Sequence, residues 1–348
     1  ANWRMLHATG KWVWRWKDRI DRKFMARFED LPLVMDSALT NFFPALSSAT
    51  QMPCGGCGAK IGADTLSSVL AELGDEFPQH CPNSRQANDA AIVSGYGAAD
   101  LVQSIDVLRE MVSDPWLMGR IAANHALSDL YASGAKPLSA LATITLPFAS
   151  SPIQGRELKH YLSGALYEFE KVDCKLLGGH SLQGQELNLG FVVNGAPIAI
   201  EPGLIGKTGL RPGDSLILTK ALGTGALFAS HMRLEANSSD VYVAIESMTQ
   251  SSFAAAKLAV EYGATAATDV TGFGLMGHLL EMLGGELGAT LFLSDVPLLA
   301  GALSSVEQGV YSTMHETNAR AKTSVGFVAP DANPDLIDLL VDPQTSGG

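Results

Sequence analysis

The chain has 348 residues, of which 47% are hydrophobic and 17% are charged. This length predicts two domains rather than one, and the composition is typical of a globular protein with a large core. The formal net charge of −12 argues against nucleic acid as a partner, because phosphate backbones bind basic surfaces. Four cysteines are too few for a disulfide scaffold, which favours a reduced protein in the cytoplasm.

The first 30 residues hold four of the five tryptophans and more basic than acidic side chains. Large apolar side chains recur at i, i+4 spacing from Trp16 to Phe28, which predicts a short amphipathic helix. We favour a helix that packs on a neighbouring domain over one that lies on a membrane surface. Proline breaks after it predict a linker, so residues 1–53 form the first segment. No apolar run of about 18 residues occurs, so we expect no transmembrane segment.

From residue 54 the pattern alternates between strands and helices, and we expect an N-terminal domain over residues 54–205. Turn and capping residues delimit the elements that we expect in it. They are strands at 101–106, 138–146 and 187–194, and helices at 115–133 and 154–171.

A second domain is expected over residues 206–348, which makes the fold class α+β with two domains in series. Its expected elements are a strand at 215–219, a helix after the glycines at 223 and 225, a helix at 241–262, a strand into Asp269 and a helix from Gly274. The sequence ends in VDPQTSGG, and a double glycine normally opens into another element. We therefore expect this domain to be truncated at residue 348.

Four aspartates stand at the ends of apolar stretches or on glycine-rich segments: Asp89, Asp106, Asp129 and Asp269. Each alone is typical of a helix cap or a turn. Together they favour Mg²⁺ ligation, because unpaired carboxylates are costly to bury and Mg²⁺ lets ATP oxygens complete its shell. Glycine loops at 178–181, 223–225 and 271–274 either offer backbone N–H groups to phosphate or form tight turns.

Cys54-Gly-Gly-Cys57 is a C-x-x-C pair. No second pair completes a four-ligand zinc site, whereas a redox disulfide stays open. The helix expected after the pair favours a thiolate at Cys57, which suits redox chemistry or a nucleophile.

The segments CGGCGAKI, NDAAIV, SID, GRIAANHALSDLYASGAKP, LLGGHS, LTKALGTG, TDVTGFGLMGH and DPQTSGG, in this order, resemble those of selenophosphate synthetases (selenide, water dikinases). The resemblance runs from about residue 54 to residue 348. It implies that ATP, selenide and water give selenophosphate, AMP and phosphate. It also implies two α+β domains of the aminoimidazole ribonucleotide synthetase-like superfamily, with the first domain forming a β-barrel across a homodimer and ATP bound in the groove.

The resemblance further implies roles for single residues. Cys57 and Lys60 match the catalytic cysteine and lysine, and Asp89, Asp129 and Asp269 match the Mg²⁺ ligands. The matches to ATP contacts are Lys60, Asn88, Asp106, Asp129, Gly178, Gly179, His180 and Ser181.

Two positions depart from the family pattern. Asn88 stands where many members carry a second aspartate, which puts one ATP or metal contact in doubt. Ala59 occupies a position that is cysteine in some relatives, so Cys57 lacks a thiol partner two residues on.

The segment WVWRWKDRIDRKFM resembles the tail of a pyridine-nucleotide-dependent flavoprotein oxidoreductase, an enzyme fused to some members of the family. Two other functions stay open. One is another ATP-using member of the superfamily, either a kinase or a ligase for a small molecule, and the other is a C-x-x-C redox or flavin-linked module. The sequence also leaves open whether selenide arrives free or from a selenium-delivery protein.

Overall fold

The computed structural model describes Ala71, Asp75 and residues 90–93, 101–199, 203–326, 328–330 and 332–348. The chain divides between Met52 and Pro53, and every described residue belongs to the second unit, Pro53–Gly348. The amphipathic helix predicted within residues 1–30 lies outside the described residues. Every helix within them is too short or too polar to cross a membrane.

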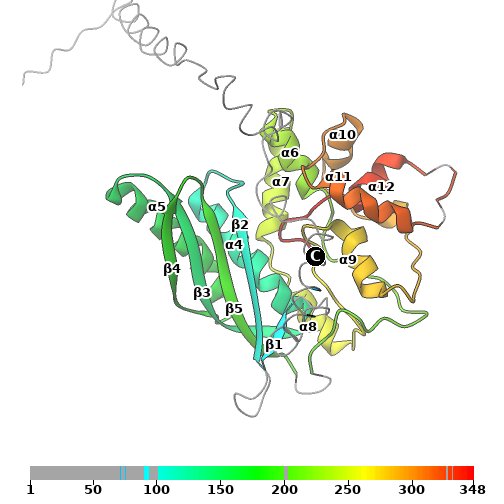
Figure 1. Cartoon of the computed structure of the whole chain (residues 1–348), viewed down its shortest axis with the longest axis horizontal. Coiled ribbons are helices and arrows are strands. Elements are labelled where there is room, and N and C mark those ends of the chain that lie inside the picture. Colours follow the sequence, from blue (N-terminus) through cyan, green and yellow to red (C-terminus); the bar gives the residue numbers. More distant parts are fainter. Residues whose placement is uncertain are drawn as a thin grey trace, which may run out of the picture. The chain divides into compact units, whose positions relative to one another are not determined.

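A five-stranded sheet with the order β1-β2-β5-β3-β4 forms the first part of the described chain. Neighbouring strands are antiparallel except β3 and β4, which α5 connects as a parallel pair. Helices α4 and α5 pack against each other and against the sheet (Figure 1). The elements are β1 (Ala91–Val93), β2 (Leu101–Arg109), α4 (Pro115–Ala132), β3 (Ala135–Pro147), α5 (Ser151–Glu170), β4 (Lys175–Gly184) and β5 (Asn188–Pro197).

The three strands and two helices predicted in this region are confirmed as β2, β3, β5, α4 and α5. Strand β4 was not predicted, and the loop expected at 178–181 is wrong because these residues belong to β4. Gly178 and Gly179 have low strand propensity, so the sequence pattern did not indicate this strand. Gly179 is nevertheless needed there, since a Cβ atom on it would lie 2.1 Å from the Ala142 carbonyl oxygen.

The second part of the described chain is mainly helical. Among the described residues after 203, strand-like backbone pairing is limited to one isolated bridge, Leu222 to Leu298. The helices are α6 (Thr224–Met232), α7 (Ser238–Thr249), α8 (Phe253–Glu261), α9 (Gly274–Leu283), α10 (Ala302–Glu307), α11 (His315–Asn318) and α12 (Pro334–Leu340), with short 3-10 turns at Leu293–Asp295 and Ala319–Ser324.

Three predictions for this part are wrong. Residues 215–219 and the segment into Asp269 have no regular secondary structure and pair with no described strand, and Ile217 is 86% exposed. The single helix predicted at 241–262 is two helices, α7 and α8, which break at residues 250–252. The Ser251 hydroxyl accepts the Phe253 N–H at 3.3 Å, a local bond that competes with a continuous helix.

Two glycines bring α4 and α5 into close contact. A Cβ atom on Gly119 would lie 2.0 Å from the Tyr161 carbonyl oxygen, and one on Gly164 would lie 2.0 Å from the Trp116 carbonyl oxygen. Because backbone atoms fill both positions, a side chain fits only if the helices separate. The position of α4 therefore depends on these glycines.

We expect Gly164→Ala to lower the free energy of unfolding by roughly 1–3 kcal/mol, because the added methyl group overpacks the contact between α4 and α5. Gly155→Ala in the same helix is the matched control, since a Cβ atom there would meet nothing within 4 Å. It should stabilise by about 0.5–1 kcal/mol through helix propensity alone. Urea unfolding measures the free energy of unfolding of both variants. Equal changes in the two would contradict the explanation by close contact of α4 and α5.

Candidate active site

Helix α4 is buried on nearly all sides because it contacts both the sheet and helices α7 and α8. It begins at Pro115, and the Asp114 carboxylate caps it by accepting the Leu117 N–H at 2.9 Å. Its buried residues nevertheless include Asn124, His125 and Ser128. Buried polar side chains need partners, and α4 finds them in the second domain.

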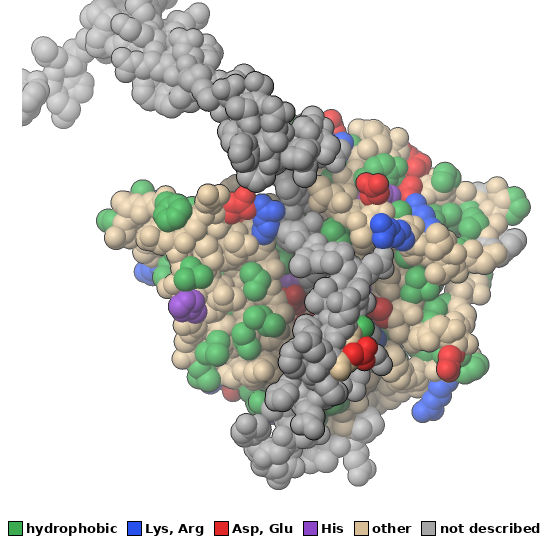
Figure 2. Space-filling model, in the orientation of Figure 1, with side chains coloured by type: hydrophobic (Ala, Val, Ile, Leu, Met, Phe, Trp, Pro, Cys, Tyr) green, Lys and Arg blue, Asp and Glu red, His purple; other side chains and the backbone are tan. Residues whose placement is uncertain are grey.

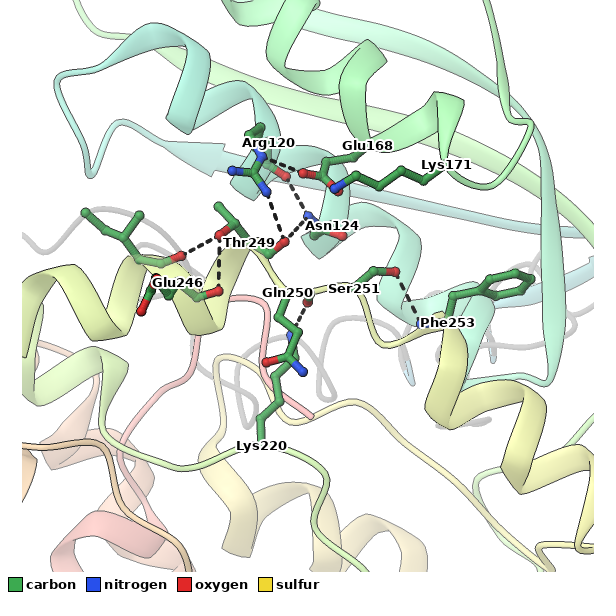
Figure 3. Close-up of polar contacts among 11 residues, drawn as sticks. Arg120, Asn124, Glu168, Lys171, Lys220, Glu246, Thr249, Gln250, Ser251 and Phe253 are labelled. Atoms are coloured by element: carbon green, nitrogen blue, oxygen red, sulfur yellow. Dashed lines mark hydrogen bonds and ion pairs between the residues drawn. The ribbon is translucent and has the colours of Figure 1, made fainter.

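The first contact joins α4 to the end of α7. The side chains of Arg120 and Asn124 donate to the Thr249 carbonyl oxygen at 3.4 and 3.2 Å (Figure 3). Glu168 of α5 accepts from Arg120 Nε at 2.5 Å and from Lys171 at 2.6 Å, which compensates the charge of its buried carboxylate.

The second contact brings predicted metal ligands to α4. The Ser128 hydroxyl donates to the buried carboxylate of Asp269, and the Ser104 hydroxyl of β2 donates to Asp129. Asp129 is itself a residue of α4, and Asp269 of the second domain is bound by Ser128, the residue that precedes Asp129 in this helix. The structure thus collects two of the predicted carboxylates around α4.

The third contact runs through His125. Its Nδ1 accepts the backbone N–H of Ser346 at 3.3 Å, so the neutral ring carries its proton on Nε2. Nε2 lies 3.7 Å from Oδ1 of Asp106, the predicted ATP contact. His125 therefore stands between Asp106 and the C-terminal residues.

Lys220 is a site residue that the sequence reasoning missed. Its ammonium group is buried and donates to the carbonyl oxygens of Gln250 and Ser346 at 2.7 and 2.8 Å (Figure 3 shows the first). Burial lowers the pKa of Lys220 to about 8, and the Asp269 carboxylate opposes this shift. The available signal was a lysine placed in an apolar run directly before a glycine loop, in LTKALGTG.

A cavity of about 900 Å³ lies beside Ser128 and Asp269. Ser128 and Tyr131 of α4 line it together with Asp269, His278 and Gly348 of the second domain. Ligand sites for small molecules occupy about 300–1,000 Å³, so the cavity is large enough for a nucleotide.

One of the predicted phosphate loops is occupied by the chain itself. The Gln344 side-chain oxygen accepts the N–H groups of Gly223 and Thr224 at 2.9 and 3.1 Å, and Asp342 accepts that of Gly225 at 3.0 Å. The interpretation of residues 223–225 as a phosphate loop is therefore wrong, because the DPQ segment already satisfies its donors.

The remaining predicted residues are placed as follows. The Gly178–Gly179–His180–Ser181 segment lies on strand β4, where no described contact joins it to Asp106 or Asp269. Within the described part of the chain, no three His, Cys, Asp or Glu side chains are arranged to hold a metal ion. Cys54, Cys57, Lys60, Asn88 and Asp89 lie outside the described residues.

Comparisons with family models confirm the α+β class and the pair of related domains. The model of the AIR synthase related protein, N-terminal domain, matches residues 87–199, and that of the C-terminal domain matches residues 211–325.

Curated relatives match most of the chain. It is 37% identical over 306 residues to a selenide, water dikinase of Desulfitobacterium hafniense, which covers 87% of each chain. It is 36% identical over 312 residues to that of Carboxydothermus hydrogenoformans, covering 87% of this chain and 88% of the relative. The Geobacter metallireducens protein is 38% identical over 301 residues, with 84% and 85% covered.

Solved structures share the fold at low identity. The thiamine monophosphate kinase of Aquifex aeolicus has a TM-score of 0.58 at 16% identity, over 82% of this chain and 88% of that one. The hydrogenase maturation protein HypE in complex with ATP has a TM-score of 0.52 at 18% identity, over 65% and 69%. These likenesses show the fold alone.

Asp342 generates a testable pH dependence. Burial raises its pKa to about 7 from 3.8, although bonds from the Ala226 N–H, the Gln344 side chain and the Gly225 N–H oppose the shift. The folded state thus keeps a proton that the unfolded chain releases, and this contribution to stability is lost as the pH rises from about 4 through about 7.

The Asp342→Asn side chain keeps an oxygen acceptor but carries no titrating proton. The stability of this variant should therefore not fall through Asp342 as the pH rises. We expect the wild type to lose on the order of a few kcal/mol relative to the variant between about pH 5 and pH 8, measured by urea unfolding. A difference that stays constant over this range would show that Asp342 is already ionised in the folded protein at the lower pH.

Proposed function

Since the chain belongs to the selenide, water dikinase family, we propose that it uses ATP to convert selenide and water into selenophosphate, releasing AMP and phosphate. The observation that carries this proposal is the identity of 34–38% to curated dikinases over most of both chains. The Asp269 carboxylate, which Ser128 of α4 binds and which lines a cavity of nucleotide size, supports this proposal.

We propose that ATP binds along α4, with Asp106 as one contact from the first domain. His125 supports this role, because its Nε2–H faces the Asp106 carboxylate while its Nδ1 is fixed by Ser346. Lys60, Asn88, Asp129 and the β4 residues Gly178, Gly179, His180 and Ser181 are proposed as further ATP contacts through the family resemblance.

We propose that Asp89, Asp129 and Asp269 hold Mg²⁺ together with ATP. The donor set fits, because carboxylate oxygens are the ligands that Mg²⁺ prefers, Asp129 belongs to α4, and Asp269 of the second domain is bound by Ser128 of the same helix. Bound Mg²⁺ neutralises charge on the phosphates. The serine hydroxyls that donate to Asp129 and Asp269 orient both carboxylates, and the burial of Asp269 excludes water around it.

Cys57 and Lys60 are proposed as the catalytic pair. A thiolate at Cys57 is a soft group that can capture or guide selenide, and the Lys60 ammonium can stabilise charge on the transferring phosphoryl group. Because the net charge of the chain is −12, such a local cation matters for binding a polyphosphate.

We propose a homodimer that pairs through the uncovered face of the sheet. Ile105 and Val107 of β2 and Leu141 of β3 are 41–59% exposed on this face, and Val192 of β5 lies in register between Ile105 and Leu141. Figure 2 shows hydrophobic side chains gathered over these strands. Exposed apolar patches of this kind mark interfaces, and a second copy of the sheet would close the β-barrel implied by the family.

Three finer proposals concern the setting of the enzyme. The cysteine content supports a reducing cytoplasm. We propose that residues 1–53 are the remnant of a fusion partner, because the segment WVWRWKDRIDRKFM resembles the tail of a flavoprotein oxidoreductase. Selenide, which is reactive when free, arrives either by diffusion or from a selenium-delivery protein.

Anaerobic incubation with ATP, Mg²⁺ and selenide, followed by phosphorus NMR, tests the function. We expect selenophosphate, AMP and phosphate in equal amounts, because both phosphoanhydride bonds of ATP are consumed. ADP without selenophosphate would instead favour a kinase or ligase for a small organic substrate.

The same assay tests the catalytic cysteine. Cys57→Ser should lose most of the turnover, because a hydroxyl is harder and far less ionised than a thiol. Cys174→Ser is the control, since Cys174 is a buried free thiol whose pKa burial raises to about 11. Equal turnover in the two variants would remove Cys57 from the mechanism.

Ile105→Glu tests the dimer. A charge on the uncovered sheet face should convert the protein to a monomer in light scattering, because an unpaired carboxylate is costly to bury in an interface. Leu234→Glu is the matched control, since Leu234 is a 91% exposed apolar residue of the second domain and not of the sheet. A dimer that survives Ile105→Glu would place the interface elsewhere.

A further inference from the structure

Ser346 has a strained backbone that both domains hold. Its φ is +50°, in the left-handed region that residues other than glycine rarely adopt. The His125 ring of the first domain accepts its N–H at 3.3 Å, and the Lys220 ammonium of the second domain donates to its carbonyl oxygen at 2.8 Å. The two bonds over-determine this conformation.

Lys220 also binds a second carbonyl, that of Gln250, at 2.7 Å. Gln250 directly follows Thr249, whose carbonyl oxygen accepts from Arg120 and Asn124 of α4 (Figure 3). Each of the two carbonyl oxygens that Lys220 binds therefore belongs to a segment that α4 also holds. The lysine joins the two segments on the side of the second domain.

Asp269 lies near this junction. Its carboxylate interacts electrostatically with the Lys220 ammonium and accepts the Ser128 hydroxyl of α4. A buried ammonium is costly unless its donors and charge are matched, and here two carbonyls and one carboxylate match it. The Gln344 N–H donates to the Thr271 carbonyl oxygen at 2.9 Å, so the C-terminal segment that Lys220 binds at Ser346 also contacts the segment that carries Asp269.

We propose that Lys220 is a positioning residue for the reaction: its ammonium joins the Ser346 and Gln250 segments so that Asp269 is held in register with Ser128 and Asp129 of α4. This inference rests on the proposed function, because its effect is measured on selenophosphate formation. A displacement of about 1 Å in a reacting group can cost about 100-fold in rate. Asp106 comes from the first domain, so ATP binding should be affected less than turnover.

Lys220→Met, which keeps an unbranched side chain one atom shorter and removes the charge, tests the proposal. We expect kcat per folded enzyme to fall by about 100-fold while KM for ATP changes much less. Lys207→Met is the matched control: Lys207 is also buried, and its ammonium group pairs with Glu281 at 2.9 Å. The control should lose stability but keep kcat near the wild-type value. A loss of kcat in Lys220→Met no greater than in Lys207→Met would overturn the proposal.

A double-mutant cycle adds a readout that a purely structural lysine would not give. His125→Leu removes the bond to the Ser346 N–H, so its effect on kcat should be non-additive with that of Lys220→Met. Additive effects would contradict a shared role at Ser346. If Lys220→Met does not fold, Lys220→Gln replaces it in every comparison, with the same expected results and the same overturning ones.

The wild-type enzyme tests the proposed function separately from the role of Lys220. Wild-type enzyme that forms no selenophosphate rejects the proposed function. Wild-type enzyme that forms it, with Lys220 variants as active as the Lys207 control, rejects the role of Lys220 alone.

Discussion

The site depends on one constraint, which is that the polar side chains of buried helix α4 must be satisfied. The sheet covers one side of this helix and the second domain covers another, so the buried side chains of Asn124, His125 and Ser128 cannot turn to bulk water, and Arg120 is half-buried beside them. They bond to Thr249, Ser346 and Asp269 instead. The contact between the domains along α4 therefore combines these polar bonds with an apolar core, and one of the bonds holds the Asp269 carboxylate.

The sequence predicted the first domain well where hydrophobic periodicity and caps agree. Helix α4 has Asp114 before it, proline at its first position and Gly134 after it, and its bounds were found to within one residue. Strand β4 was missed because its glycines look like a loop, although close backbone approach demands glycine at 179. Residues 215–219 have a strand-like pattern but no described pairing partner, which a local pattern cannot reveal.

The aspartates of the candidate site could be predicted from the sequence, but the hydrogen bonds that link its residues could not. Asp106, Asp129 and Asp269 could be identified because carboxylates beside apolar residues are costly to bury unpaired. In the structure Asp129 belongs to α4, and Asp106 and Asp269 contact its residues His125 and Ser128. Lys220 and His125 act on backbone groups far away in the sequence, so no spacing rule identifies them. The phosphate loop predicted at 223–225 failed for a similar reason, since its donors are taken by residues about 120 positions later.

The break between α7 and α8 has a consequence for how the domains communicate. In a continuous helix the carbonyl oxygens of Thr249 and Gln250 would accept bonds from the next turn and be withdrawn from other partners. Because the chain leaves helical geometry at Gln250, both oxygens point outward, one toward Arg120 and Asn124 and the other toward Lys220. Helix-favouring substitutions at the two serines of the break, positions 251 and 252, would therefore weaken the bonds that Thr249 and Gln250 accept without altering a single charge. Two small neutral residues thus help to keep these two carbonyl oxygens available to α4 and Lys220.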